Sequence, residues 1–277
     1  MAGGRECQPG DGPDSHHNSR RTTGRRLGGR RSGKEGEGWL THLQEQGQAP
    51  SVETAKETRV HLLDEEKEAF TTYSVYDCFG YELSHGGIPY VLSSGTWHQV
   101  VPDFLIRVND YVDDIDRPPI ALPAWNGAEN EGEYNTRCGN VPGFLHFDTA
   151  DVLFGGGPSR FEFCDFLHQR SKSLVFAKVG ARSSGMSHLV EQLRRTAELL
   201  FNVDGSYRTE LAKVFKKYHP NTDRSWLKSR PDNADWNLCL VSLGRPAKTL
   251  PFFAKCALYR LHRGLTERGH KVYFGSV

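Results

Sequence analysis

Hydrophobic and polar positions follow the patterns of a folded α/β protein over most of the chain. Aromatic and β-branched residues fill 72–83 and 88–92, and the Gly86-Gly87 pair between them predicts a hairpin. The segment 102–115 begins with a proline and has apolar residues at helical spacing, which predicts a helix. Hairpin and helix together predict a small α+β subdomain over 70–118.

The second half is more regular and predicts an α/β core over 128–277. Its strands read as buried or alternating runs, and its helices as amphipathic stripes. Ser187 is expected to cap the first long helix. The expected elements are a short helix or turn at 129–138, strands at 144–148, 160–167 and 173–180, helices at 187–201 and 207–218, a strand at 238–243, a helix at 252–268 and a strand at 271–275. The fold class is therefore α/β, with a mixed central sheet and flanking helices.

The N-terminal region has a different composition. Residues 1–37 contain Leu27 as the only large aliphatic residue apart from Met1, and Gly, Ser, Arg and Pro dominate. Such a segment cannot bury enough apolar surface to offset its ordering entropy, so we expect a disordered, basic Gly/Arg-rich tail over 1–55. Its three Arg pairs fit an arm that binds nucleic acid, and they equally fit a loose tail without a function.

Composition excludes several classes of protein. The 277 residues carry 35 Lys and Arg against 34 Asp and Glu, so the bulk charge identifies no polyanionic partner. No apolar run is long enough for a membrane span, and the start lacks a signal sequence. The six cysteines form no C-x-x-C pair, which argues against zinc or a disulfide framework and fits the cytoplasm. The glycines of 155–157 lack the lysine of a phosphate loop and fit a tight connection.

One local patch is basic. Residues 208–230 carry seven basic side chains against two acidic ones, and Tyr207, Tyr218 and Trp226 are interleaved with them. Positive charge with aromatic faces is typical of surfaces that follow a nucleic-acid backbone and stack bases, although solvated helix faces are often basic too. The residues of this patch expected to bind nucleic acid are Lys213, Lys216, Lys217, Trp226 and Lys228.

Several motifs together resemble a known family. The blocks are GIPYVLSSGTWHQVVPDFLIRVNDYVDDI, EGEYN, GFLHFDTADVLFGGGPSRFEFCDFL, SSGMSHLVEQLRRTAELL and LPFFAKCALYRLHRGLTERGHKV. They resemble the sporadically distributed family of bacterial proteins, a domain-of-unknown-function family found near mobile-element or phage-defence loci. The resemblance covers 70–277 and implies that the chain corresponds to the C-terminal half of longer members. A truncated member, or a partner that supplies the missing N-terminal half, would follow from this.

The strands of the core also resemble the PD-(D/E)xK nuclease superfamily, which implies a restriction-endonuclease-like αβββαβ core. Asp165 ends one predicted strand, Lys178 lies on the next, and Gln192 lies on the following helix. In that superfamily acids on the second and third strands hold Mg²⁺, the lysine polarises water or phosphate, and some members add the glutamine. An acid on a helix before the first strand is also usual, and Glu133 occupies that place.

This chain departs from the superfamily at one position. Phe176 stands where the acid two residues before the lysine is expected, so a second metal ligand must be Glu133, Asp148 or Glu162. Strict alternation places Glu162 on the face opposite Asp165 unless a bulge rotates it. A structural salt bridge between Asp165 and Lys178 is the competing interpretation. Beside such a site, nucleic acid is expected to contact Ser183, Ser184 and His188.

The expected function is that of a metal-dependent, nuclease-like phosphodiesterase acting on nucleic acid in bacterial defence or mobile elements. The alternative is a non-catalytic module that binds nucleic acid or protein. No other catalytic motif, such as a G-x-S-x-G elbow or an H-E-x-x-H helix, is present in the sequence.

Overall fold

The computed structural model describes residues 35–64, 68–86, 88–148, 150–154, 160–180 and 183–277. The chain divides into two compact units, residues 1–50 and 51–277. In the first unit, α1 (Glu35–Glu45) is a helix, and α2 (Val52–Glu57) opens the second. The helix α1 and the first four residues of α2 lie within the range 1–55, so the expectation of disorder is wrong for these residues. The rest of that expectation, over 1–34, lies outside the described residues, as do Gly87 and the glycine run 155–157.

Two small antiparallel sheets follow α2 in the second unit. The strands β1 (Arg59–Leu63) and β2 (Ala69–Ser74) form a hairpin. The strands β3 (Tyr81–His85), β4 (Ile88–Ser93) and β5 (Thr96–Gln99) form a meander. The pairing of β3 with β4 confirms the predicted hairpin, but its first strand begins at Tyr81, because 72–83 also contains the end of β2 and a 3₁₀ turn at Tyr76–Cys78.

The helix α3 (Pro102–Asp113) confirms the helix predicted from apolar spacing, with Pro102 in its first turn. Its buried residues, Val108 and Val112, belong to the main hydrophobic core. Proline is favoured in the first turn of a helix because the backbone N–H that it lacks has no helical acceptor there.

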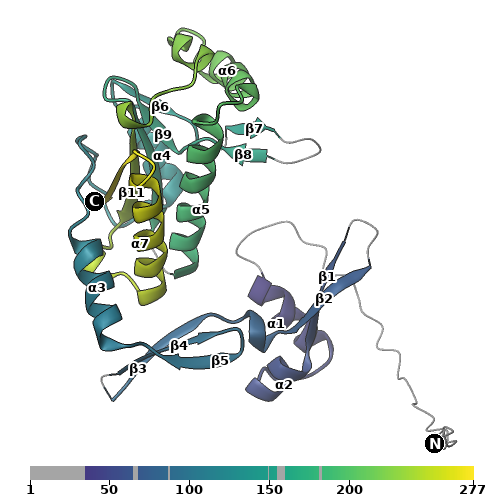
Figure 1. Cartoon of the computed structure of the whole chain (residues 1–277). Helices are drawn as coiled ribbons and strands as arrows, with labels where there is room; N and C mark the ends of the chain where they lie inside the picture. Colours follow the sequence, from purple (N-terminus) through teal and green to yellow (C-terminus); the bar gives the residue numbers. More distant parts are fainter. Residues whose placement is uncertain (1–34, 65–67, 87, 149, 155–159, 181–182) are drawn as a thin grey trace, which may run out of the picture. The chain divides into compact units, whose positions relative to one another are not determined.

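The core of the second unit is a five-stranded mixed sheet (Figure 1). Its strand order is β12 (Lys271–Ser276), β11 (Asn237–Leu243), β10 (Ser173–Val179), β9 (Phe166–His168) and β6 (Phe144–His146). The first three are parallel to one another, whereas β9 is antiparallel to both β10 and β6. This confirms the mixed α/β class. The central strands are buried on both faces, as their apolar runs predict.

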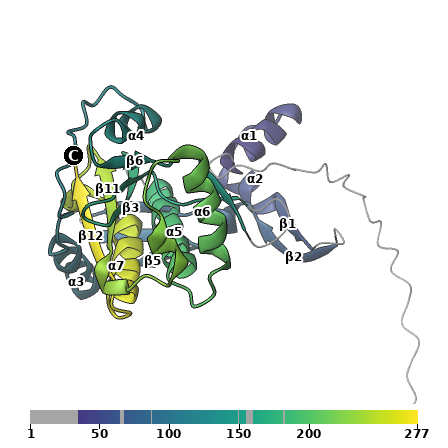
Figure 2. The same cartoon turned by 90° about the horizontal axis from the view of Figure 1, so that it is seen from above.

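Helices cover the two faces of this sheet. On one face α5 (Ser183–Leu200) and α7 (Phe252–Thr266) pack on Leu174, Phe176 and the matching residues of β11 and β12. On the other face α4 (Glu131–Gly139) packs on Val175 and Ala177, which point the opposite way along β10. The views in Figures 1 and 2 show this layering, with α6 (Ser206–Tyr218) following α5. When β7 (Asp151–Leu153), β8 (Arg160–Glu162) and α6, which lie between them along the chain, are left out, α4, β6, β9, β10, α5 and β11 follow the order αβββαβ.

The predicted strand 160–167 is in fact two strands in two sheets. The strand β8 (Arg160–Glu162) pairs with β7 (Asp151–Leu153), and β9 pairs with β10 in the main sheet. Between them, Phe163, Cys164 and Asp165 are all buried, at 0%, 0% and 4% exposure. Alternation breaks here because the chain passes from one sheet to the other through the core. Strict alternation therefore does not apply to Glu162, which accepts a hydrogen bond from Gln192 and lies near enough to Asp165 to act on its pKa.

One smaller difference concerns the start of α5. The helix α5 begins at Ser183, so Ser187 is not its cap; the Ser187 hydroxyl donates to the Ser183 carbonyl inside the helix. The remaining turns are short 3₁₀ helices at Ser225–Lys228, Asn233–Asp235 and Ala247–Thr249. Within the described part of the chain, none of the helices combines the length and apolar character needed to cross a bilayer.

Candidate functional site

An ion pair marks the end of β10. The Nζ of Lys178 lies 2.7 Å from Glu131 Oε1, and the other carboxylate oxygen of Glu131 accepts a hydrogen bond of 3.4 Å from the Val179 amide. Glu131 is the first residue of α4, whereas Lys178 precedes the last residue of β10. Their side chains are 31% (Lys178) and 29% (Glu131) exposed, so solvent reaches the pair. The partner of the predicted lysine is thus Glu131, which the sequence analysis missed, and the alternative salt bridge to Asp165 does not form.

Asp165 lies inside the protein beside this pair. Its Oδ2 accepts a hydrogen bond of 2.6 Å from the Ala177 amide on β10. Burial raises the pKa of Asp165 well above its usual range, and the negative charges of Asp148, Glu131 and Glu162 act in the same direction. Its backbone carbonyl accepts hydrogen bonds from the amides of Phe147 and Asp148, at 2.8 and 3.0 Å. Asp165 therefore connects the ends of β6 and β10.

Glu162 and Gln192 meet across the break between the two sheets. Gln192 Nε2, on α5, donates a hydrogen bond of 3.0 Å to Glu162 Oε2. Burial raises the pKa of Glu162, and the charges of Asp148 and Asp151 add to the increase while Lys178 opposes it. The predicted glutamine therefore positions a carboxylate of the site.

The structure thus brings most of the predicted site together around one lysine. The charges of Glu131 and Asp148 contribute to the raised pKa values of Glu162 and Asp165, so these four carboxylates lie near one another. In the described part of the chain, no three groups of the types His, Cys, Asp and Glu are placed so that they could hold one metal ion. Burial is the largest cause of the raised pKa values of Glu162 and Asp165, and the neighbouring carboxylates add to it; a bound cation would favour the charged forms of both groups.

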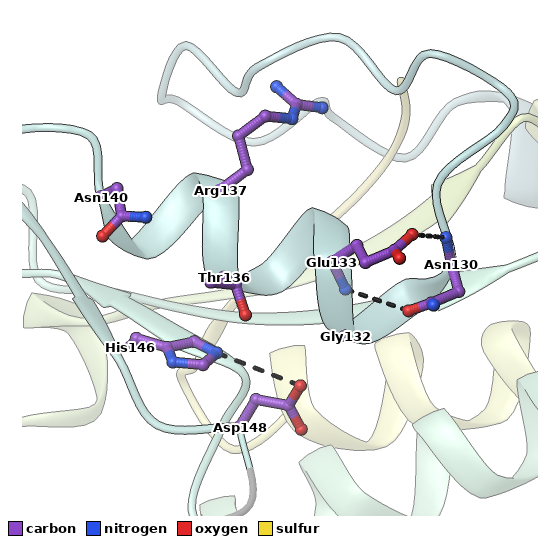
Figure 3. A pocket seen from close by; sticks show the side chains of 8 residues that line it. All are labelled: Asn130, Gly132, Glu133, Thr136, Arg137, Asn140, His146 and Asp148. Atoms are coloured by element: carbon purple, nitrogen blue, oxygen red, sulfur yellow. Dashed lines mark hydrogen bonds and ion pairs between the residues drawn. The ribbon is translucent and has the colours of Figure 1, made fainter.

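A hollow of about 620 Å³ opens beside α4, and one of these four carboxylates, that of Asp148, lines it. Figure 3 shows the side chains that line it. Glu133, a predicted metal ligand, belongs to a capping box here: its Oε2 accepts from the Asn130 amide at 2.8 Å, and its own amide donates to Asn130 Oδ1 at 3.0 Å. The residues lining the hollow are Asn130, Gly132, Glu133, Thr136, Arg137, Asn140, His146 and Asp148.

His146 is a second residue that the sequence analysis missed. Its Nε2 lies 4.0 Å from Asp148 Oδ2, and Figure 3 shows both side chains below α4. Burial lowers the pKa of His146, and the neighbouring Asp148 partly opposes this. The signal was present in the sequence, because His146 and Asp148 are two residues apart at the end of a strand and so tend to share a face.

The residues expected to contact nucleic acid near Lys178 have different surroundings. The Ser183 hydroxyl donates to Glu82 Oε1 at 2.9 Å, so it is bonded within the protein. His188 is exposed, and its pKa is lowered by partial burial and by Lys178. The side chain of Ser184 lies outside the described residues.

The basic patch retains its lysines on the surface but not all of its aromatic rings. Lys213 pairs with Glu210 at 2.7 Å, and Lys216, Lys217 and Lys228 are exposed. Trp226 packs against Trp236 with their ring centroids 4.5 Å apart, and Tyr207 is 1% exposed. Their interleaving in the sequence therefore reflects core packing, and among the three aromatic residues of the patch Tyr218 is the exposed one.

Fold and site define a class: a mixed α/β protein with an acidic cluster around one solvent-reachable lysine. The chain belongs to a family of unknown function, DUF6119, whose model matches residues 9–277. The matched span is wider than the range 70–277 and includes most of the N-terminal region that was expected to be an unrelated tail. Comparison with curated proteins and with solved structures finds no match.

Proposed function

We propose that this protein is a metal-dependent phosphodiesterase that cleaves nucleic acid. The observation that carries the proposal is the placement of the Lys178 ammonium group, 2.7 Å from Glu131 and near Glu162, beside the buried carboxyl of Asp165. Carboxylates repel a negatively charged phosphodiester, and a divalent cation together with a lysine offsets this repulsion. The αβββαβ order of α4, β6, β9, β10, α5 and β11 adds support, because the PD-(D/E)xK resemblance implies that order.

Each residue has a role in this proposal. Asp165 and one of Asp148 or Glu162 would hold Mg²⁺, with water and phosphate oxygens completing its coordination, and the ion would neutralise charge on the reacting phosphate and lower the pKa of a bound water. Glu131 takes the place that the resemblance assigned to Glu133, because it is the acid of α4 that contacts Lys178. Lys178 donates to the phosphate or to the attacking water once a substrate displaces Glu131.

The substrate and setting belong to the same proposal. Nucleic acid is favoured over small phosphodiesters because exposed lysines of α6 and Lys228 offer contacts to a phosphate backbone. The proposal includes a setting in the bacterial cytoplasm, in defence or mobile-element systems, which the resemblance to the sporadically distributed family implies.

The first test removes the ammonium group. In Lys178→Ala, we expect Mg²⁺- or Mn²⁺-dependent cleavage of DNA or RNA to fall by about 10²–10³-fold, since a preorganised charge at the reacting group typically contributes that much. EDTA should abolish cleavage by the wild-type protein. Lys172→Ala is the matched control, because Lys172 precedes the other end of β10 and forms an exposed pair with Asp235. Unchanged cleavage by Lys178→Ala would refute the assignment.

The second candidate is a module that binds nucleic acid or protein without cleaving it. Phe176 favours it, since this residue stands at the expected acid position and is fully buried at 0% exposure. The arrangement of the described carboxylates, with no three-group metal cluster, points the same way. Salt-sensitive binding without metal-dependent nicking by the wild-type protein would identify this module.

A further inference from the structure

Two buried polar atoms beside Asp148 have no hydrogen-bond partner in the described protein. They are His146 Nε2 and Asn135 Oδ1. Both belong to side chains that approach one carboxylate oxygen: His146 Nε2 lies 4.0 Å from Asp148 Oδ2, and Asn135 Nδ2 lies 3.4 Å from it. Buried polar atoms are nearly always bonded, so two exceptions at one carboxylate point to a ligand.

We propose that His146 and Asp148, with the Asn135 amide behind them, form a binding site for a divalent transition-metal ion. The nitrogen and the oxygen are 4.0 Å apart. One ion bonded to both at about 2.1 Å spans this separation. The Asn135 side chain is fully buried, and its Nδ2 faces Asp148 Oδ2 at 3.4 Å, so it orients this carboxylate while water would supply the remaining ligands.

The site is reachable from solvent. His146 and Asp148 both line the hollow beside α4, and their side chains are 33% and 19% exposed. In Figure 3 the Thr136 hydroxyl points from α4 toward the His146–Asp148 pair. Space therefore remains for water or a substrate oxygen on the ion.

The donor types decide which metal fits. Mg²⁺ prefers oxygen ligands alone, whereas an imidazole beside a carboxylate suits Mn²⁺, Co²⁺ or Zn²⁺. Asp148 is a metal ligand here and a candidate metal ligand in the proposed function, on which the next statement rests. If the protein is a phosphodiesterase, its metal would be a transition-metal ion rather than the expected Mg²⁺.

The test measures binding of Mn²⁺ itself by the loss of the free-ion EPR signal during titration of the full chain. We expect His146→Gln and Asp148→Asn each to weaken Mn²⁺ binding at least about tenfold, since even outer-shell partners of a metal contribute that much. His98→Gln is the matched control, because His98 is exposed on β5. We also expect a tenfold excess of Mg²⁺ to leave Mn²⁺ bound. Equal Mn²⁺ affinity in the wild type and His146→Gln overturns the proposal, and displacement by equimolar Mg²⁺ does so too.

Lys178→Ala separates this inference from the proposed function. The variant should bind Mn²⁺ like the wild type, because Lys178 is not a ligand. Mn²⁺ bound through His146 without any cleavage supports the metal site and refutes the hydrolase. Mg²⁺-dependent cleavage that survives in His146→Gln, with no Mn²⁺ bound by the wild type, refutes the metal site alone. Circular dichroism melts of each variant without metal establish that the fold is retained.

Discussion

At the scale of single residues, the burial of Asp165 changes the pH at which its carboxyl group ionises. It is 4% exposed, and its hydrogen bond from Ala177 does not offset the loss of hydration, so its pKa in the folded protein is raised. In the unfolded chain the same carboxyl ionises at its ordinary pKa. The folded state therefore holds the proton more tightly, and the stability that this contributes is present at low pH. It is lost as the pH rises through the raised pKa.

Asp165→Asn should remove this pH dependence. The asparagine keeps an oxygen that can accept from the Ala177 amide but carries no charge. We expect the free energy of unfolding of the wild type, relative to Asp165→Asn, to fall as the pH rises above about 4, by up to about 1.4 kcal/mol per pH unit. Urea unfolding between pH 4 and 8 in the presence of a chelator measures it. Parallel curves for the two proteins would contradict the burial argument.

The alanine variant at the same position tests the hydrogen bond separately. Asp165→Ala leaves the buried Ala177 amide without an acceptor, so it should be about 1–3 kcal/mol less stable than Asp165→Asn. The comparison is made at one pH by the same urea unfolding. Equal stability of the two variants would mean that another group accepts from this amide.

The candidate site could be predicted from the sequence only as far as residue types and strand order go. Lys178, Asp165 and Gln192 were expected beside one another on those grounds, and the structure places them in one region. Glu131 was missed in favour of Glu133, because successive residues of a helix point about 100° apart and two positions reverse the direction. The exact start of α4, set by the Asn130 cap, decides which acid faces Lys178.

At the scale of elements, Glu82 joins the β3–β5 meander to two helices. Its Oε1 accepts from the Ser183 hydroxyl at the start of α5, and its Oε2 accepts from the Phe253 amide in the first turn of α7, at 2.9 and 3.1 Å. A carboxylate is favoured at helix N-termini because their free amides and dipoles attract negative charge. One side chain thus completes the starts of both helices.

Glu82→Ala should therefore destabilise the protein. Hydrogen bonds to a charged group contribute about 1.5–3 kcal/mol, and we expect a loss in that range in the free energy of unfolding. Hydrogen exchange should accelerate in the first turns of α5 and α7. Glu57→Ala is the control, because Glu57 is exposed at the end of α2. A loss no greater than that of the control would show that the contact is not maintained in solution.

Element types were more predictable than element partners. Helices such as α3 and α7 followed from apolar periodicity and proline positions, since these are local features. The division of 160–167 into β8 and β9 could not be seen, because a buried run looks the same whether the chain stays in one sheet or changes sheets. Partner choice depends on residues far away in the sequence.

At the scale of the whole molecule, the net charge of +1 provides almost no long-range attraction to a polyanion. Binding to nucleic acid would have to come from local lysines such as Lys216 and Lys217 on α6. Each phosphate that a lysine neutralises contributes about 0.9 to the slope of log affinity against log salt concentration for duplex DNA. The slope is therefore a count of the contacts.

The double variant Lys216→Ala/Lys217→Ala should lower that slope by about 2 and weaken binding at low salt. Fluorescence anisotropy with a labelled duplex at several salt concentrations measures both effects. Lys271→Ala, an exposed lysine at the start of β12, should leave the slope unchanged. If the double variant and the wild type give the same slope, nucleic acid does not bind at α6.

The buried passage of the chain from β8 to β9 links the hydrophobic core to the position of Asp148. Phe163 and Cys164 are sealed in the hydrophobic interior, and the next residue, Asp165, holds the Asp148 amide through its carbonyl. We expect a shorter apolar side chain at Phe163 to move the Asp165 carbonyl, and with it the Asp148 backbone that is hydrogen-bonded to this carbonyl. Substitutions in the hydrophobic core could thus change the position of Asp148 while every ionisable residue stays the same.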